Sequence, residues 1–308
     1  MTVLEAALIT VIAAATPLLL AAMGELVVER SGVLNLGVEG MMLMGAIVGF
    51  AAGIHPAALP SPVVMLAAAG AGALMASLFA LLVLVFRTNQ VATGLALAIF
   101  GIGLSKLVGA SYTGLPANPF PTISIPGLSS LPIIGTPLFA TDAFTYLSWL
   151  MIPAVAWFLY RSKAGLILRA VGENHDSAHA IGHKVLWVRL GAILFGGAMS
   201  GLGGAYLSLV KTPHWAENMT AGRGWVALAL IVFATWRPGR LALGAYLFGL
   251  LSIMELYAQA SAVPIPTNFL TMMPFLATIL VLVIMSRDPS ILRRHAPGSL
   301  GKLFNPSR

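Results

Sequence analysis

The sequence contains no cysteine and few charged residues. Only 9% of its 308 residues are Asp, Glu, Lys or Arg, whereas a soluble globular domain carries about 25%. The lack of cysteine excludes disulfides, thiolate metal sites and cysteine nucleophiles. Hydrophobic residues make up 58% of the chain, and its mean hydropathy is +0.93. Because the apolar runs are continuous and do not alternate as in outer-membrane barrels, the composition predicts an all-α polytopic membrane protein.

Motifs for several kinds of chemistry are also missing. The chain has no GxxxxGK[ST] phosphate loop, so we expect no ATP hydrolysis by this chain, and it has neither GxSxG nor HExxH. His175, His179 and His183 are spaced four apart and could share a metal, but no cluster of carboxylates lies near them in the sequence. We therefore expect these histidines to contact a partner or solvent, and we expect no metal or cofactor in this chain.

Apolar runs that approach the roughly 20 residues needed for a membrane span recur along the whole sequence. The first has no basic residue before it and is too long for a typical signal-peptide core, so we expect it to be retained. No linker divides the chain, and residues 1–308 are predicted to form one transmembrane domain. The seventh run is short, which is compatible with a tilted, broken or re-entrant segment. The nine predicted spans are Val3–Met23, Leu36–Gly53, Val63–Phe86, Val91–Val108, Ala143–Tyr160, Leu190–Val210, Trp225–Trp236, Leu241–Ala260 and Phe269–Ser286.

The distribution of Lys and Arg predicts the orientation, because cytoplasmic loops carry an excess of both. Segment 161–189 and the tail 287–308 hold most of them, and placing both segments inside also brings the remaining short basic turns inside. The N-terminus is then outside and the C-terminus inside. The formal charge of +7 is thereby explained by topology, and no nucleic-acid partner is expected. Only three of the 17 basic residues fall elsewhere, namely Lys106, Lys211 and Arg223.

Proline and glycine are concentrated in particular places. Segment 110–142, the longest predicted outside segment, contains repeated proline, which removes backbone donors and blocks regular helix. We expect it to form an ordered cap or a flexible loop. Glycines spaced by four residues let helices approach closely, and we expect them to pack helices within one subunit. This spacing occurs at Gly45, Gly49 and Gly53, and again at Gly197 and Gly201.

The segment ERSGVLNLGVEG, residues 29–40, places charge between the first two spans. Charge at membrane depth is costly and is usually kept for a function. Ser31 and Gly32 can break the helix there. One interpretation is a short cytoplasmic turn with a local Glu29–Arg30 pair. The other is a polar element at the inner end of a translocation path. For the second, the candidate path residues are Asn35, Glu39, Asn89, Gln90, Thr93, Glu255 and Gln259.

The longest predicted cytoplasmic connection is segment 161–189. Glu173 and Asn174 can begin a short helix with an acid at its positive end, and Gly182 can end it. A short helix held parallel to the membrane suits docking to a cytoplasmic partner, although a solvated loop is an equally good interpretation. The candidate docking residues are Gly172, Glu173, Asn174, Ala178, Ala180 and Gly182, with the two alanines small enough for close approach.

Three segments together resemble the membrane permeases of bacterial ABC importers for simple sugars and nucleosides. Residues 29–46, ERSGVLNLGVEGMMLMGA, are similar to the opening signature of the nucleoside subgroup, whose receptor is a basic-membrane-protein-type lipoprotein. Residues 161–185 resemble the family's coupling loop, and residues 222–249 resemble a third family block. The resemblance implies a vitamin-B12-importer-like, type II-like ABC permease fold, in which segment 161–189 contacts the ATPase.

The same resemblance implies partners and a function. The partners are a second, different permease, an ABC ATPase whose two nucleotide-binding domains bind ATP and Mg, and an external substrate-binding lipoprotein, all at the bacterial cytoplasmic (inner) membrane. The chain itself would be no enzyme but a path for nucleosides, with purine nucleosides favoured. A simple sugar such as ribose is the alternative substrate. The residues alone also leave open a secondary transporter, with Glu39 and Glu255 as relay candidates, or an intramembrane enzyme, for which no nucleophile and base are visible.

The predicted orientation can be tested by cysteine labelling, which is clean because the chain has no cysteine of its own. We expect Ser129→Cys to react with a membrane-impermeant maleimide in intact cells. Ser177→Cys should react only after the membrane is opened. Labelling of both positions from the same side would contradict the nine-span topology.

Overall fold

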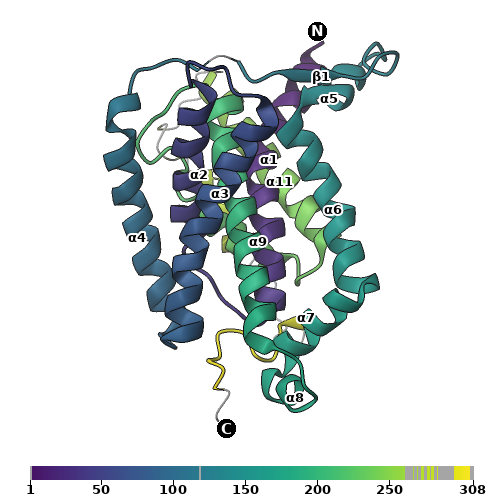
Figure 1. The fold of residues 1–308 in the computed structure, drawn as a ribbon. Coiled ribbons are helices and arrows are strands. Elements are labelled where there is room, and N and C mark those ends of the chain that lie inside the picture. Colours follow the sequence, from purple (N-terminus) through teal and green to yellow (C-terminus); the bar gives the residue numbers. More distant parts are fainter. Residues whose placement is uncertain are drawn as a thin grey trace.

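The computed structural model describes residues 2–117, 119–260 and 295–305, together with scattered single positions between 261 and 294. Helices make up nearly all of the regular structure in this part of the chain (Figure 1). In chain order the elements are α1 (Val3–Arg30), α2 (Val38–Gly53), α3 (Ser61–Ala80), the π-helix η1 (Leu81–Val85), α4 (Gln90–Gly109), the 3-10 turn η2 (Ala110–Tyr112), β1 (Thr122–Ser124), α5 (Gly135–Phe139), β2 (Ala140–Asp142), α6 (Ala143–Arg161), α7 (Lys163–Glu173), α8 (His175–Ala180), α9 (Val185–Tyr206), the π-helix η3 (Leu207–Lys211), α10 (Arg223–Phe233) and α11 (Pro238–Ala260).

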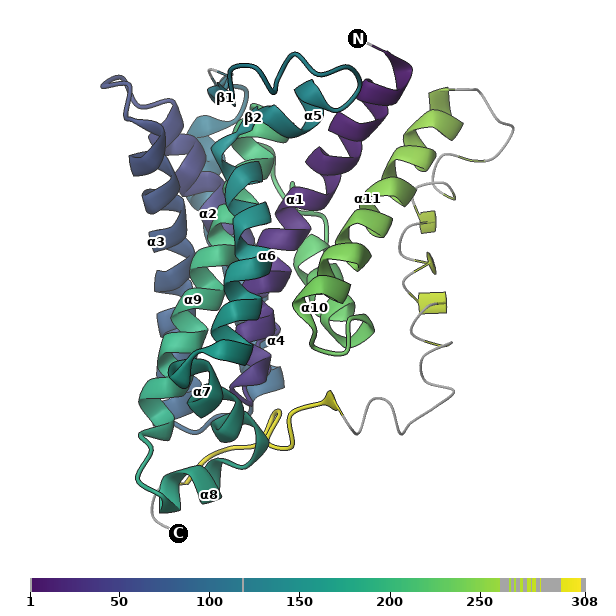
Figure 2. The same ribbon diagram turned by 90° about the vertical axis from the view of Figure 1, so that its right-hand side faces the viewer.

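The long helices stand side by side in one bundle, and the short elements gather at its two ends (Figures 1 and 2). The start of α1 lies at one end with β1 and α5, and we call this the cap end. Helices α7 and α8 lie at the opposite end with residues 295–305, and we call this the α8 end. The α8 end is the one for which the basic residues predict a cytoplasmic position.

Six helices of the described part are long and apolar enough to cross a membrane, which makes the chain a multi-pass helical membrane protein. They are α1, α3 with η1, α4 with η2, α6, α9 with η3, and α11. The second and seventh predicted spans correspond to shorter apolar helices, α2 and α10. The ninth predicted span, Phe269–Ser286, lies outside the described residues apart from single positions.

Helix α1 is longer than the sequence predicts, because it continues past Met23 to Arg30. It begins with a capping box, in which the Thr2 side chain accepts from the Glu5 backbone amide and the Glu5 carboxylate accepts from the Thr2 amide. Its last two turns contain Glu25 and Glu29, which end the apolar run in the sequence. Both are nevertheless buried, and their partners lie on other elements.

Helix α9 lies at the centre of the bundle, where it packs against α1, α2 and α3. A Cβ atom on Gly201 would collide with the Ala68 carbonyl oxygen, and a Cβ on Gly45 would collide with the Gly201 backbone. A Cβ on Gly197 would likewise meet Ala76. The prediction that these glycines pack helices within one subunit is therefore confirmed.

Residues 110–117 and 119–142 cover the cap end with short elements (Figure 1). Strands β1 and β2 pair antiparallel, with Thr122 opposite Asp142 and Ser124 opposite Ala140. This segment is tied to the loop after α9, since the Ala117 amide donates to the Pro213 carbonyl at 3.0 Å. The choice between an ordered cap and a flexible loop, which the prolines left open, stays a prediction. The short helix α5 and the strand pair were not expected from the sequence.

We expect Gly201→Val to destabilise the bundle, because the added side chain would collide with the α3 backbone. Overpacking commonly costs about 1–3 kcal/mol. The measurement is the apparent melting temperature of the purified chain in detergent. The matched control is Gly191→Val on the same helix, where a Cβ would meet nothing within 4 Å. Equal melting temperatures for the two variants would show that α3 and α9 do not pack as described.

Candidate functional site

The chain breaks after α1 and runs without regular helix until α2 begins at Val38. Gly32 has φ +87°, a left-handed conformation that glycine adopts without strain. Ser31, Val33 and Asn35 in this break are fully buried. The break lies where the sequence predicted it. Irregular backbone at membrane depth is tolerated only where protein or enclosed water satisfies its polar groups, so the partners of these residues decide what the break does.

The Glu39 carboxylate, in the first turn of α2, holds the start of α10. One oxygen accepts from the Thr220 hydroxyl at 2.5 Å and from the Gly222 amide at 2.8 Å. The other oxygen accepts from the Gly224 amide at 2.7 Å. Glu39 is 1% exposed. The carboxylate thus satisfies amides that a helix N-terminus leaves unpaired, where a negative charge is also favoured by the helix dipole.

Two further buried glutamates fasten the end of α1. The Glu29 carboxylate accepts from the Trp236 indole N–H at 2.6 Å, which ties α1 to the turn between α10 and α11. The Glu25 carboxylate accepts from the Asn35 amide at 3.2 Å, which ties α1 to the break. Arg30 does not pair with Glu29 as one interpretation of the sequence expected; its guanidinium donates to the Trp236 carbonyl at 2.9 Å. Together with Glu25, the charged residues of the ERSGVLNLGVEG segment therefore connect α1, the break, the start of α10, and the turn between α10 and α11.

The remaining candidate path residues lie in three places: the break, the start of α4 and helix α11. Asn35 and Gln90 belong to the break: the Asn35 side chain accepts from the Gly37 amide at 2.9 Å, and Gln90 accepts from the Leu34 amide at 2.8 Å. Asn89 caps α4 by accepting from the Ala92 amide, and the Thr93 hydroxyl pairs with that of Thr88. On α11, Gln259 is half-buried, and the side chain of Glu255 lies outside the described part.

A short helix, α8, is present in the predicted docking segment, but the expected start is partly wrong, because Glu173 ends α7 and does not lie in the first turn of α8. Asn174 caps it by accepting from the Ser177 amide at 3.0 Å, and Gly182 follows it with φ +91°. Glu173 is exposed at the end of α7. Gly172 packs so closely on the Arg30 carbonyl that a Cβ would collide with it. The end of α7, directly before α8, is therefore held against the end of α1.

The two alanines of α8 face opposite ways. Ala180 is exposed, in agreement with a docking role. Ala178 is 3% exposed and packs in a small apolar cluster with Val171, Val185 and Phe304. Ala178 consequently does not lie on the outer face of the helix, contrary to the expectation that it is open to close approach by a partner. Its inward position depends on the C-terminal segment, which no local pattern around Ala178 reveals.

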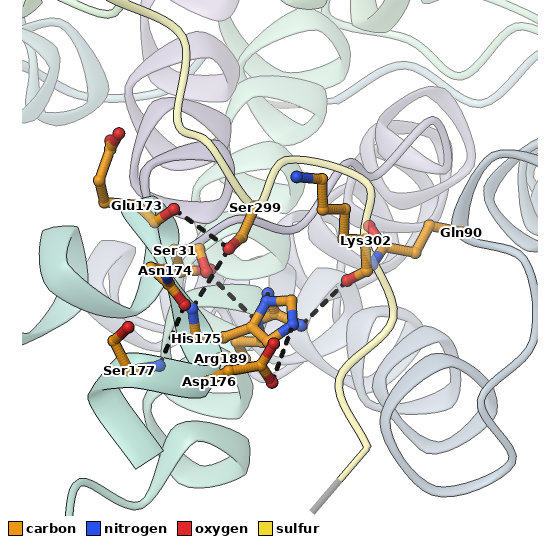
Figure 3. Close-up of polar contacts among 10 residues, drawn as sticks. All are labelled: Ser31, Gln90, Glu173, Asn174, His175, Asp176, Ser177, Arg189, Ser299 and Lys302. Carbon is orange, nitrogen blue, oxygen red and sulfur yellow. Dashed lines mark hydrogen bonds and ion pairs between the residues drawn. The ribbon is translucent and has the colours of Figure 1, made fainter. Parts of the chain in front are cut away.

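The described part of the tail, residues 295–305, crosses the α8 region as a strap (Figure 3). The Ser299 amide donates to the Gly172 carbonyl at 2.8 Å, and the Ser299 hydroxyl accepts from the His175 amide at 3.2 Å. The Gly301 amide donates to the Gly32 carbonyl at 3.2 Å. The strap therefore joins α8 to the break after α1.

Arg189 at the start of α9 completes this junction. It is 1% exposed, and it donates to the Ser31 carbonyl, to the Lys302 carbonyl and to Nδ1 of His175 (Figure 3). A guanidinium can only donate, so Nδ1 of His175 accepts and its proton resides on Nε2, 3.6 Å from Asp176. Burial, followed by the charge of Arg189, lowers the pKa of His175 below its ordinary value. The ring is neutral at pH 7.

This role of Arg189 was missed at the sequence level, where the residue counted only toward topology. A basic residue placed one turn inside an apolar run is the signal that could have marked it. The expected lack of a metal at His175, His179 and His183 stays a prediction. Within the described ranges there is no group of three or more His, Asp or Glu side chains that could hold one.

A second polar region, also missed, is a cavity of about 420 Å³ at the cap end. Its lining combines hydroxyl groups with aromatic rings and an acid. Asp142 caps α6 through the Thr145 amide and hydroxyl, at 3.0 and 2.7 Å. The residues that matter most for its chemistry are Thr10, Phe120, Asp142, Thr145, Tyr206 and Ser252.

We expect Glu39→Ala to destabilise the protein by on the order of 3 kcal/mol, because the Thr220 hydroxyl and two buried amides lose their acceptor. The apparent melting temperature in detergent measures this effect. Glu39→Gln should fall in between, since its amide oxygen can still accept. Glu217→Ala is the control, because Glu217 is exposed and pairs only with Lys106 at the surface. A Glu39→Ala variant as stable as this control would show that the carboxylate does not hold α10.

Comparisons with known proteins identify the family of this chain. Residues 7–285 match the family model described as "Branched-chain amino acid transport system / permease component". The chain is 38% identical, over 95% of both chains, to a protein of Haloferax volcanii provisionally named a glucose ABC transporter permease. It is 32% identical to the guanosine ABC transporter permease of Bacillus subtilis and 30% identical to a nucleoside ABC transporter permease of Lactococcus lactis, each over 87% of this chain and 88% of the other. The chain belongs to this family of ABC transporter permease subunits and is not an enzyme.

Proposed function

We propose that this chain forms one half of the membrane path of an ATP-driven importer and carries nucleosides. Residues 1–308 would make up one permease domain in a bacterial cytoplasmic membrane. A second, different permease would complete the path, and an external lipoprotein would deliver the substrate. ATP and Mg would bind to the two nucleotide-binding domains of a separate ATPase. A permease of this kind transports only together with an ATPase and a substrate-binding partner, so this chain must have a contact surface for each.

The observation that carries the proposal is the exposed face of α8. The helix lies at the end of the bundle for which the basic residues predict a cytoplasmic position. Asp176, Ser177, His179 and Ala180 are exposed on it, and the adjacent Ile181 is 73% exposed. A short helix that presents small and polar side chains at the end of the bundle suits a groove in another protein. We assign this face to the ATPase.

The contacts behind α8 give a route for coupling. A push on α8 would act on Gly172, which contacts the end of α1, and on Ser299, which belongs to the tail strap. Arg189 connects the same helix to the Ser31 carbonyl through His175. Coupling travels through packed elements and hydrogen-bond networks of this kind. The break after α1 would therefore move with α8, and through Glu29 it would move the turn between α10 and α11.

The substrate would make its contacts at the cap end. A nucleoside offers hydroxyl groups and a flat base, and a cavity with a few placed polar groups and aromatic rings suits such a ligand. The cavity between α1, α6 and α9 provides hydroxyls from Thr10 and Ser252 and rings from Phe120 and Tyr206. The acids around the break, by contrast, already accept from protein donors. Of the path candidates, Asn35, Glu39 and Gln90 would then support the path without touching the substrate.

A simple sugar is the second candidate substrate. The Haloferax relative, named for glucose, is more similar to this chain than the two relatives named for guanosine and nucleosides. The opening signature in residues 29–46 favours the nucleoside. Both substrates carry vicinal hydroxyls, so the lining of the cap-end cavity fits either, and uptake must decide between them.

We expect Ala180→Trp to abolish ATP-driven uptake in the complete importer, because a bulky side chain on the exposed face of α8 would block the ATPase contact. Uptake of labelled guanosine and of labelled glucose should be measured side by side in proteoliposomes. We expect guanosine to be transported, only with ATP, and without sensitivity to an uncoupler. Transport of glucose alone would assign the chain to sugars.

The control is Ala57→Trp, an exposed alanine in the loop between α2 and α3 at the opposite end of the bundle. It should leave uptake and ATPase co-purification unchanged. Ala178→Trp is unsuitable, because its side chain would disrupt the cluster around Phe304. Normal uptake and ATPase binding by Ala180→Trp would exclude α8 as the docking element. Uptake driven by an ion gradient without ATP would identify a secondary transporter.

A further inference from the structure

A second cavity, of about 540 Å³, lies at the α8 end between the ends of α1 and α6 and the start of α11. Neither the predicted topology nor the proposed transport function uses it. Among the residues that the structure describes, its lining is basic and contains no acidic side chain. The residues that define its chemistry are Arg30, Tyr160, Arg237, Gly239, Arg240 and His295.

The arginines around this cavity contact groups that carry no negative charge. Arg240 donates to the Thr235 hydroxyl at 2.8 Å, and Arg30 donates to the Trp236 carbonyl at 2.9 Å. Arg237 lies 3.5 Å from Nε2 of His295. In the ranges that the structure describes, the carboxylates within 4.0 Å of a basic side chain are those of Glu217, beside Lys106, and Asp176, beside the neutral His175, so none pairs with these arginines. Three guanidinium groups around one cavity create a positive potential that favours an anion.

The backbone adds to this potential. Helix α11 has 23 residues and begins at Pro238, so the amides of Gly239 and Arg240 lie in its first turn. First-turn amides have no partner within their helix, and the helix dipole places partial positive charge there. Side-chain guanidinium groups and helix amides are the two kinds of donor that proteins use for phosphate. Together they provide donors that suit an oxyanion such as phosphate.

The depth of the cavity indicates where such an anion comes from. The spans of α1 and α6 end at Arg30 and Arg161, and the span of α11 begins at Pro238. The cavity thus lies where three apolar spans give way to polar residues, which is the level of lipid headgroups. Trp157 and Tyr160, in the last turns of α6, are 64% and 44% exposed. Exposed Trp and Tyr at the ends of spans mark the membrane interface.

We propose that this cavity binds the phosphate group of an anionic membrane lipid. Arg237 and Arg240 contact the phosphate oxygens, Arg30 supplies positive charge from α1, and the first turn of α11 donates from its amides. Basic pockets between membrane helices are known to take lipid headgroups of this kind. A bound lipid would add a further contact among the ends of α1 and α6 and the start of α11.

The test uses the purified full chain in detergent and native mass spectrometry, with three separate probes: phosphatidylglycerol, phosphatidylcholine and inorganic phosphate. We expect phosphatidylglycerol to bind at least tenfold more tightly than the zwitterionic phosphatidylcholine. The double variant Arg237→Gln/Arg240→Gln should lose roughly 10- to 30-fold in affinity for phosphatidylglycerol, as two surface charges near an anionic lipid predict. Inorganic phosphate at millimolar concentration should not displace the bound lipid.

The matched control is Arg87→Gln/Lys184→Gln, which removes the same charge from exposed positions that do not line the cavity. It should bind phosphatidylglycerol like the unmodified chain. Both double variants should keep the melting temperature of the lipid-free protein, which shows that they fold. Equal binding of the two lipids, or full phosphatidylglycerol binding by the cavity variant, would overturn the proposal. Displacement by inorganic phosphate, with the same sensitivity to the cavity variant, would overturn the lipid as its source and assign the cavity to a soluble phosphate.

Discussion

A helix that breaks inside a membrane protein leaves backbone amides and carbonyls where no water can reach them, and the structure of this chain depends on meeting that cost. Each unsatisfied group would cost several kcal/mol in a hydrocarbon environment. The break between α1 and α2 meets the cost with side chains from distant parts of the sequence. Gln90 accepts from the Leu34 amide, Glu25 from the Asn35 amide, and Arg189 donates to the Ser31 carbonyl. The polar residues of the bundle are thus placed mainly by the needs of the backbone.

The need to satisfy the polar groups of the break also links α8 to the helices around the break. Because the break is buried, its backbone groups form hydrogen bonds with neighbouring elements. These elements include α4, α9 and the tail strap at Gly301. Glu29 and Glu39 extend the connection to the turn before α11 and to the start of α10. A cluster in which every member holds several others has few independent ways to move. A force applied at α8 would therefore shift the break as a unit, which is what a coupling element requires.

Local signals in the sequence predicted the local features, and long-range contacts account for what could not be predicted. Asn174 and Gly182 define α8 through their own backbone preferences, and Ser31 with Gly32 marks the break in the same way. The orientation of Ala178 depends on Phe304, and the role of Glu39 depends on Thr220 and Gly224. No periodicity relates such distant positions. The end of α1 was misplaced for a related reason: hydropathy counts Glu25 and Glu29 as exposed charges, whereas tertiary contacts bury them.

The hydrogen bonds of each polar side chain also distinguish residues that hold the fold from residues that could bind a substrate. A side chain whose hydrogen bonds are all made to the protein has nothing left to offer a passing ligand, and giving one up would leave a buried donor unpaired. Glu39, with three donors on its two oxygens, is in that position. In the cap-end cavity the balance differs, since among the described residues the Ser252 hydroxyl donates to the Phe248 carbonyl of its own helix. A hydroxyl of this kind can still bond a ligand at no cost to the fold. Under the proposed function, the charged segment 29–40 would thus support the path, and less conspicuous threonines and serines would form its surface.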